Sequence, residues 1–146
     1  MTTPRSGSPT ARLAASAVDL AFCVAYDGHL AASALERKLA DRELVVAELD
    51  GELAGLLRLD HLWSIVPHVA QVRVLERHRR RGVGRALVAF AADQARAGGA
   101  NVLLSSTRPD KAAAQAWHRA LGFVECGSLA GMGPSGEPVI VYRKDL

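Results

Sequence analysis

Alternating and helically spaced apolar positions divide the chain into short strands and four helices. Period-two or continuous apolar runs predict strands, and apolar positions three or four residues apart predict helices. The strands are expected at residues 11–15, 43–49, 53–59, 68–74, 102–104, 123–129 and 138–144. The helices are expected at residues 18–26, 33–40, 82–97 and about 110–120. This order, β-α-α-β-β-β-α-β-α-β-β, predicts an α/β fold with a mixed sheet and helices on its faces.

Turn and capping residues sharpen several boundaries. Asp50-Gly51 is a strong hairpin-turn signal between two apolar runs. Residues 61–67, with Trp63, are expected to form a loop, and Thr107 with Asp110 resembles a helix capping box.

Composition limits the class of protein. The chain has 146 residues, 49% of them apolar and 23% charged, with a net charge of +3. These values predict one soluble globular domain at residues 11–146, after a polar, breaker-rich disordered tail at residues 1–10. No apolar run approaches the length of a membrane span, so we expect no membrane contact.

Cysteine usage points to a reducing compartment. Cys23 and Cys126 are too few for a disulfide framework and lack metal-ligand spacing, so no metal site is predicted. We expect two free, buried thiols and a cytoplasmic protein.

The cationic residues gather in one short stretch. Six arginines fall within thirteen positions: Arg73, Arg77, Arg79, Arg80, Arg81 and Arg85. Gly82 and Gly84 lie at the start of the predicted helix, directly after a predicted strand. Glycine lets a ligand approach the backbone closely, and the amides of a first helical turn favour an anion. This pattern predicts a phosphate site on the helix N-terminus.

The motif Arg79-x-x-Gly82-x-Gly84 after a strand resembles the GNAT superfamily of N-acetyltransferases. Trp117 to Phe123, a helix leading into a Gly-Phe strand start, is similar to a second segment of that family. The resemblance implies that the loop binds the pyrophosphate of acetyl-coenzyme A, used as co-substrate. It implies that the backbone of the preceding strand holds the pantetheine arm, with the Val72 amide on the acetyl oxygen. The implied coenzyme-binding residues are Val72, Arg73, Val74, Arg79, Arg80, Arg81, Gly82, Val83, Gly84 and Arg85.

Two histidines are the candidates for acid–base chemistry. His68 lies near the start of the strand before the loop, where several family members carry the base, and His61 is a weaker candidate. His118 stands where many family members have a tyrosine that protonates the coenzyme thiolate. The alternative for His118 is an ordinary helix position, with solvent protonating the thiolate.

The acceptor is less defined. Trp63, Trp117 and Tyr26 are candidates to line its site, although helical spacing also favours a packed face for Trp117 with Ala113, Ala116 and Ala120. The scattered acids Asp27, Asp60 and Glu76 are expected on a solvated surface.

The sequence therefore predicts an N-acetyltransferase that transfers an acetyl group from acetyl-coenzyme A to a primary amine by direct attack. A small amine or a peptide amine would be the acceptor, and a homodimer is compatible with the resemblance. A catalytically weak acyl-coenzyme A sensor is one alternative, favoured by the missing tyrosine. A nucleic-acid-binding module is the other, disfavoured because the arginines occupy one turn and aromatic residues are only 5% of the chain.

Overall fold

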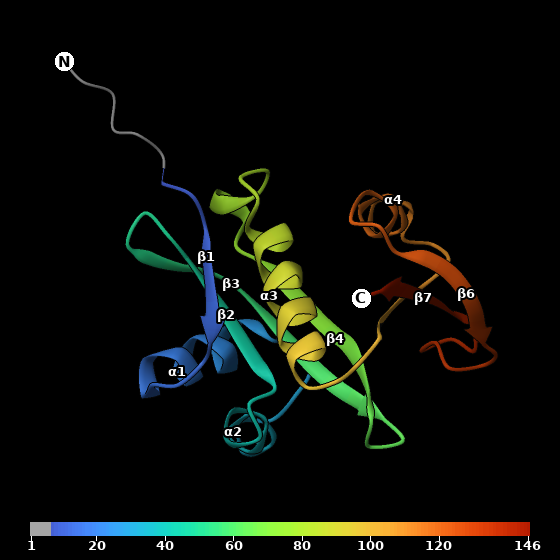
Figure 1. The fold of residues 1–146 in the computed structure, drawn as a ribbon, viewed down its shortest axis with the longest axis horizontal. Coiled ribbons are helices and arrows are strands. Elements are labelled where there is room, and N and C mark those ends of the chain that lie inside the picture. The colour runs from blue at the N-terminus through green and yellow to red at the C-terminus, as the bar shows by residue number, and fades with distance from the viewer. Residues whose placement is uncertain (1–6) are drawn as a thin grey trace. The chain divides into compact units, whose positions relative to one another are not determined.

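The structure is a computed structural model that describes residues 7–146. Its central element is a seven-stranded mixed sheet. Its strands are β1 (Thr10–Leu13), β2 (Leu44–Leu49), β3 (Glu52–Leu62), β4 (Val66–Val74), β5 (Val102–Thr107), β6 (Val124–Leu129) and β7 (Val139–Asp145). The helices are α1 (Ala17–Tyr26), α2 (Ala32–Ala40), α3 (Val83–Ala97) and α4 (Ala112–Ala120), with a short 3-10 helix η1 (Glu76–His78). The strand order is β1-β2-β3-β4-β5-β7-β6, which confirms the predicted mixed α/β fold (Figure 1).

The chain divides into two compact units. The first contains the chain up to Leu59 together with Gln71–Ala91, and the second contains Asp60–Ala70 and Ala92–Leu146. Residues 1–6 of the predicted tail lie outside the described residues, while β1 already begins at Thr10. None of the described helices is both long enough and apolar enough to cross a bilayer.

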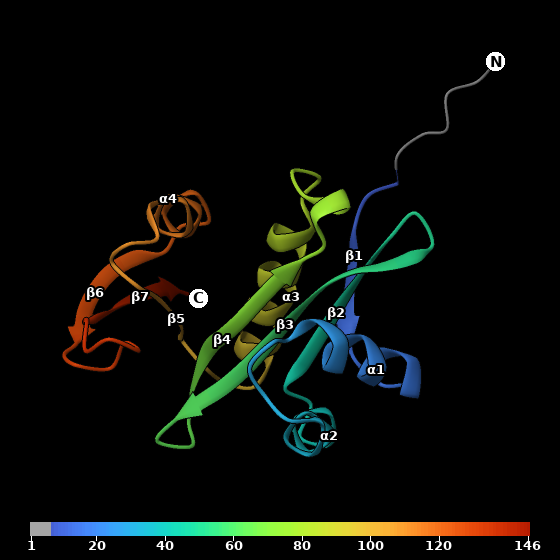
Figure 2. The same cartoon turned by 180° about the vertical axis from the view of Figure 1, so that it is seen from behind.

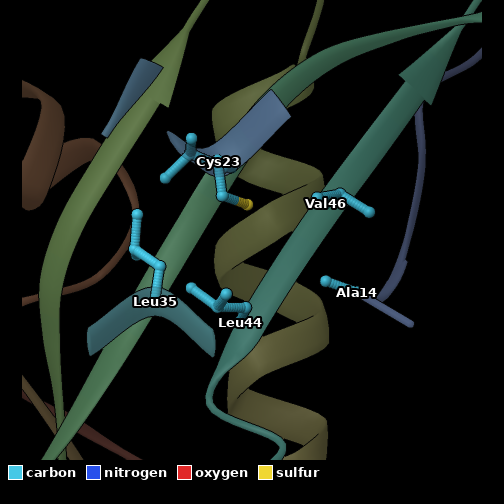
Figure 3. Packing of buried hydrophobic residues seen from close by; sticks show 6 residues of the cluster. Ala14, Cys23, Leu35, Leu44 and Val46 are labelled. Carbon is cyan, nitrogen blue, oxygen red and sulfur yellow. The ribbon is translucent and has the colours of Figure 1, made fainter. Parts of the chain in front are cut away.

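In the first unit, β1, β2 and β3 pair in antiparallel fashion between two helical layers. Helices α1 and α2 lie on one face of these strands and the first part of α3 lies on the other (Figures 1 and 2). Apolar side chains from α1, α2 and β2, and from Ala14 directly after β1, meet in one buried cluster (Figure 3), which includes Cys23, Leu35, Leu44 and Val46. Both faces of β2 and β3 are covered, so their apolar residues form continuous runs and do not alternate with polar residues.

Gly55 in β3 leaves room for α3 on the opposite face. A Cβ atom at this position would lie 2.8 Å from the Arg73 carbonyl oxygen and 2.9 Å from a methyl group of Val83. Val83 and Leu87, in the first turns of α3, are 1% and 0% exposed. The absence of a side chain at Gly55 therefore sets how closely α3 approaches β3 and the end of β4.

A capping box fixes the start of α1. The Ser16 hydroxyl accepts a hydrogen bond from the Asp19 amide, and the Asp19 carboxylate accepts one from the Ser16 amide. Arg12 in β1 donates to both carboxylate oxygens, at 2.6 and 2.9 Å. The hydrogen bond from Arg12 holds the pKa of Asp19 well below its usual range. The helix is thus tied to the edge strand by charge as well as by packing.

A second ion pair lies entirely inside the first unit. Asp27, the C-cap of α1, is 0% exposed and accepts a hydrogen bond of 2.8 Å from Nε of Arg58 in β3. Its other carboxylate oxygen accepts from the amides of His29 and Leu30. The surface position predicted for Asp27 is therefore wrong. The pair fixes the loop between α1 and α2 to the sheet.

The second unit is built on antiparallel pairs β5–β7 and β7–β6, covered by α4. The first part of β4 pairs in parallel with β5 at His68↔Leu104 and Val69↔Ser105. Leu103, Phe123 and Tyr142 are at most 2% exposed and form its apolar interior. Tyr142 in β7 stacks on His118 in α4 with ring centroids 4.6 Å apart, so a histidine belongs to this interior.

Three local predictions were wrong. The expected loop at residues 61–67 is a tight β3–β4 turn, in which Trp63 and Ser64 adopt φ values of 52° and 64°. Thr107 belongs to β5, and α4 begins after Lys111 without a side-chain cap. Cys126 is exposed on β6, whereas burial raises the pKa of the Cys23 thiol to about 12.

We predict that Asp27→Ala lowers the free energy of unfolding by about 3–5 kcal/mol, because it leaves the Arg58 charge buried without its partner. Burial raises the pKa of Asp27, but Arg58 and the two amides outweigh it and the net pKa lies below its ordinary value. The stabilisation is therefore present above about pH 4 and is lost as the pH falls through the folded pKa. Urea unfolding at several pH values measures both effects.

Glu48→Ala is the matched control, because it removes a half-exposed carboxylate from Arg12 and should cost at most about 1 kcal/mol. Equal losses in the two variants would contradict the assignment of the buried pair.

Candidate functional site

The loop between β4 and α3 ends at a helix N-terminus, where the first backbone amides have no intrahelical acceptor. Gly82 adopts φ 83°, and its carbonyl accepts the first helical hydrogen bond, from the Ala86 amide at 3.0 Å. In an α-helix the amides before that first donor have no intrahelical acceptor. Here those amides belong to Gly82, Val83, Gly84 and Arg85. Together with the helix dipole, they make the predicted anion site.

The cationic side chains of this loop fall into two groups. Arg81 pairs with Asp50 at 2.8 Å, and Arg77 pairs with Glu52 at 3.1 Å. Arg79 donates from Nε to the Val74 carbonyl at 3.3 Å. Among the described residues, Arg80 and Arg85 form no ion pair, and both are exposed. Thus only some of the arginines predicted to bind the anion lack an ion pair among the described residues.

The end of β4 lies in the same unit as this loop. Val72 and Val74 are half-buried, and the chain after them is held to β3 by a hydrogen bond from the Leu75 amide to the Ala54 carbonyl. The Val74 carbonyl already accepts from Arg79. The structure therefore brings Val72, Arg73 and Val74 into one unit with Arg79–Arg85. Their contact with a coenzyme arm stays a prediction.

His118 is enclosed in the second unit. It is 5% exposed, and its Nδ1 lies 2.6 Å from the Ala114 carbonyl, which can only accept. Nδ1 therefore carries the proton, and Nε2 accepts from the Ser105 hydroxyl at 2.7 Å. Burial lowers the pKa of His118 below its ordinary value, although the bond to Ala114 opposes that shift. The geometry favours a neutral, structural histidine, and the proton-donor role stays a prediction.

His68 has a different environment in the same unit. Its Nε2 lies 3.0 Å from the Ser106 hydroxyl, and its Nδ1 lies 3.9 Å from an Asp60 carboxylate oxygen. Its side chain is 17% exposed, so the ring is accessible yet oriented by two polar neighbours. The role of His68 as a general base stays a prediction.

The two predicted catalytic histidines lie on opposite faces of β5. Ser105 bonds His118 and Ser106 bonds His68. Successive side chains of a strand point to opposite faces. The two imidazoles therefore do not converge on one point, and a single substrate atom cannot be served directly by both.

The three aromatic candidates for the acceptor site have different surroundings. Trp63 is 83% exposed at the β3–β4 turn. Trp117 is half-buried against the His118 ring, and the three alanines predicted to share its packed face are exposed, so that face was predicted wrongly. Tyr26, with Phe22 and Arg77, lines an open hollow of about 430 Å³ in the first unit.

Sequence reasoning missed Asp50 and Glu52 as partners of the loop. Both lie at the β2–β3 turn, and Glu52 also contacts His78 at 2.5 Å. The signal was present in the element order. Because β3 and β4 are joined by a hairpin, the first residue of β3 lies next to the residues that follow β4.

A strand–loop–helix with arginines beside a helix N-terminus is the arrangement that the sequence predicted for a phosphate site. Residues 12–123 match the acetyltransferase (GNAT) family, so the chain belongs to that family.

The chain is similar to a streptothricin acetyltransferase from Streptomyces lavendulae, with 36% identity over 88 residues. This match covers 59% of the chain and 46% of the relative, so the matched part spans less than half of that protein. A GNAT-family acetyltransferase from Bacillus cereus shares the fold with a TM-score of 0.79 and 21% identity, over 95% and 98% of the two chains. A Bacillus anthracis structure in complex with acetyl coenzyme A has a TM-score of 0.65 and 24% identity, over 70% and 61%.

We predict that His118→Phe lowers the free energy of unfolding by about 1–3 kcal/mol, because the Ser105 hydroxyl loses its buried partner. The lowered pKa of His118 also makes wild-type stability depend on pH. That stability is present above the unfolded pKa of about 6.5 and is lost as the pH falls toward the folded pKa. Histidines titrate between about pH 5 and 8, so chemical unfolding is measured over this range. The free energy of unfolding should rise with pH in the wild type and not in the variant.

His29→Ala is the control, since His29 is exposed. If the pH slope persists in His118→Phe, then His118 is not the buried neutral group inferred above.

Proposed function

We propose that this chain is an acetyl-coenzyme A-dependent N-acetyltransferase that acetylates a primary amine by direct attack. The observation that carries the proposal is the loop at Gly82, where positive-φ backbone leads into four amides without an intrahelical acceptor at the start of α3. Family membership supports the donor, because acetyltransferases of this family use acetyl-coenzyme A.

The residues present fit the pyrophosphate of such a co-substrate. Gly82 is exposed, and among the described residues a Cβ at this position would meet only Pro9, at 4.0 Å, so the backbone is open to a ligand. The amides from Gly82 to Arg85 would bind the phosphate oxygens, and Arg80 and Arg85 would add forked donors. The main chain of Val72 and Val74 would bind the pantetheine arm and the acetyl oxygen.

His68 is the base in this proposal. The amine nitrogen forms the new C–N bond while the thioester C–S bond breaks. The proton that the amine loses goes to His68, directly or through a water molecule. The coenzyme leaves as the thiolate and takes a proton from solvent, because neutral His118 has its Nδ1 proton committed to Ala114. Asp60 and Ser106 would orient the His68 ring.

The acceptor class is proposed from chemistry and from one relative. Streptothricin acetyltransferase is the name of the relative with 36% identity, so streptothricin belongs in any acceptor panel for this chain. That match covers only 59% of the chain, and small amines and peptides remain in the same panel. The cytoplasmic location and the homodimer stay predictions.

An acyl-coenzyme A sensor is the second candidate function. The burial of His118, with both ring nitrogens engaged, favours it, because the usual proton donor of the family is then missing. A sensor would bind the donor through the same loop but transfer no acetyl group.

We predict that acetyl-coenzyme A raises the melting temperature and that an amine panel containing streptothricin releases free thiol. Ligand binding to the folded state alone stabilises it, which gives the thermal shift a physical basis. Absence of any shift would remove both the enzyme and the sensor. Stabilisation without thiol release from any amine would favour the sensor.

We predict that His68→Ala lowers kcat by about 10²–10⁴ and removes the acidic limb of the kcat/KM profile, because the base is lost. KM for acetyl-coenzyme A should change little. The same measurement on His61→Ala tests the weaker candidate. A loss of the acidic limb in His61→Ala rather than His68→Ala would transfer the role of base.

A further inference from the structure

The β2–β3 turn carries acids that contact the coenzyme loop at three places. Asp50 pairs with Arg81 at 2.8 Å. Glu52 pairs with Arg77 at 3.1 Å and with His78 at 2.5 Å. One short turn therefore contacts two arginines and one histidine in the segment from η1 to Gly82.

His78 shows how much the loop depends on this turn. Its side chain is 6% exposed, and its Nδ1 is buried without a hydrogen-bond partner among the described residues. Its polar contact is the one from Nε2 to Glu52. A buried imidazole with one orphan nitrogen is unfavourable unless a strong partner retains it, and Glu52 is that partner.

The loop backbone is also strained. Arg80 adopts φ 63°, a left-handed conformation that non-glycine residues seldom enter, and Gly82 adopts φ 83°. Such conformations persist where surrounding contacts hold them. The neighbouring Arg81 is anchored by Asp50, and Arg79 by the Val74 carbonyl. The strained residue thus lies between two fixed ones.

Asp50 links a further segment. Its other carboxylate oxygen accepts a hydrogen bond of 3.1 Å from the Gly7 amide. Arg81 and Gly7 together lower the pKa of Asp50, with Arg81 the larger cause. The carboxylate is therefore ionised at neutral pH and holds the turn, the loop and the segment before β1 together.

The two acids neutralise some of the arginines and leave others without an ion pair. Arg77 and Arg81 have their charge satisfied within the protein, whereas Arg80 and Arg85 form no ion pair in the part of the chain that the structure describes. A loop with every arginine uncommitted would repel itself and would have to be ordered by the ligand, which weakens binding.

We propose that Asp50 and Glu52 are positioning residues, which clamp the coenzyme loop in its anion-binding conformation before the ligand arrives. Arg77 and Arg81 hold the loop to these acids through their ion pairs. Arg80 and Arg85 then bind the phosphates. The inference rests on the proposed use of coenzyme A by this loop.

Calorimetric titration with coenzyme A, at physiological salt, tests the clamp on the full chain. Asp50→Asn should raise Kd about five-fold, because part of the binding free energy is then used to order the loop. Glu52→Gln should act in the same direction. Asp50→Glu should restore most of the affinity, because the carboxylate can still reach Arg81.

Hydrogen exchange supplies the readout that a general loss of stability would not move. The hydrogen-bonded amides of His78, Arg79 and Ala86 should exchange faster in free Asp50→Asn than in the free wild type, with the α1 and α2 amides unchanged. Asp93→Asn is the control for net charge, since it removes an exposed acid that pairs with Arg96. It should change neither Kd nor the exchange of the loop.

The outcomes separate the two levels of the proposal. A wild type that does not bind coenzyme A overturns the proposed function and the clamp with it. Normal binding by the wild type, with Asp50→Asn within two-fold of it, overturns the clamp alone. Tighter binding by Asp50→Asn also overturns it, and makes Asp50 a competitor of the phosphates for Arg81.

Discussion

The packing of α3 against Gly55 is the constraint on which the first unit depends. With no Cβ on Gly55, Val83 and Leu87 reach the sheet, and the start of α3 is fixed beside the Arg73 carbonyl in β4. Any larger residue would push the helix from the strands, because backbone atoms on the other side cannot yield. The loop from Val74 to Val83 then has both of its ends determined. The amides at the start of α3 follow from that geometry, and Gly82 supplies the positive φ with which the chain enters the helix.

Charge and backbone play separate roles around this loop. The backbone amides supply direction, since their positions are set by the helix, and the arginines supply attraction. A cluster of like charges beside a strained backbone is unstable unless some of the charge is neutralised. The β2–β3 turn does this with two carboxylates. In the second unit, β5 separates two histidines by the simple alternation of its side chains, and this leaves one accessible imidazole and one structural imidazole.

The sequence predicted the features that depend on local pattern. The strand before the loop, the glycines, the helix after it and the Asp50-Gly51 turn all follow from spacing and composition, and the element order gave the mixed sheet. What failed were the features that tertiary contacts decide. Asp27 is an ordinary acid in sequence, and only the position of Arg58 across the unit makes it a buried one. Trp63 and Ser64 form a turn that local rules reserve for Asn and Gly.

The contrast between the two thiols has a practical consequence. Cys23 is packed between α1 and the sheet, and its raised pKa keeps it as an unreactive thiol, whereas Cys126 is exposed on β6, the last strand in the sheet order. A maleimide dye would therefore attach to the native protein at one site without any engineered cysteine. The second unit thus has a natural attachment site for a fluorescent probe, and the loop between β4 and α3, which belongs to the first unit, keeps its natural residues.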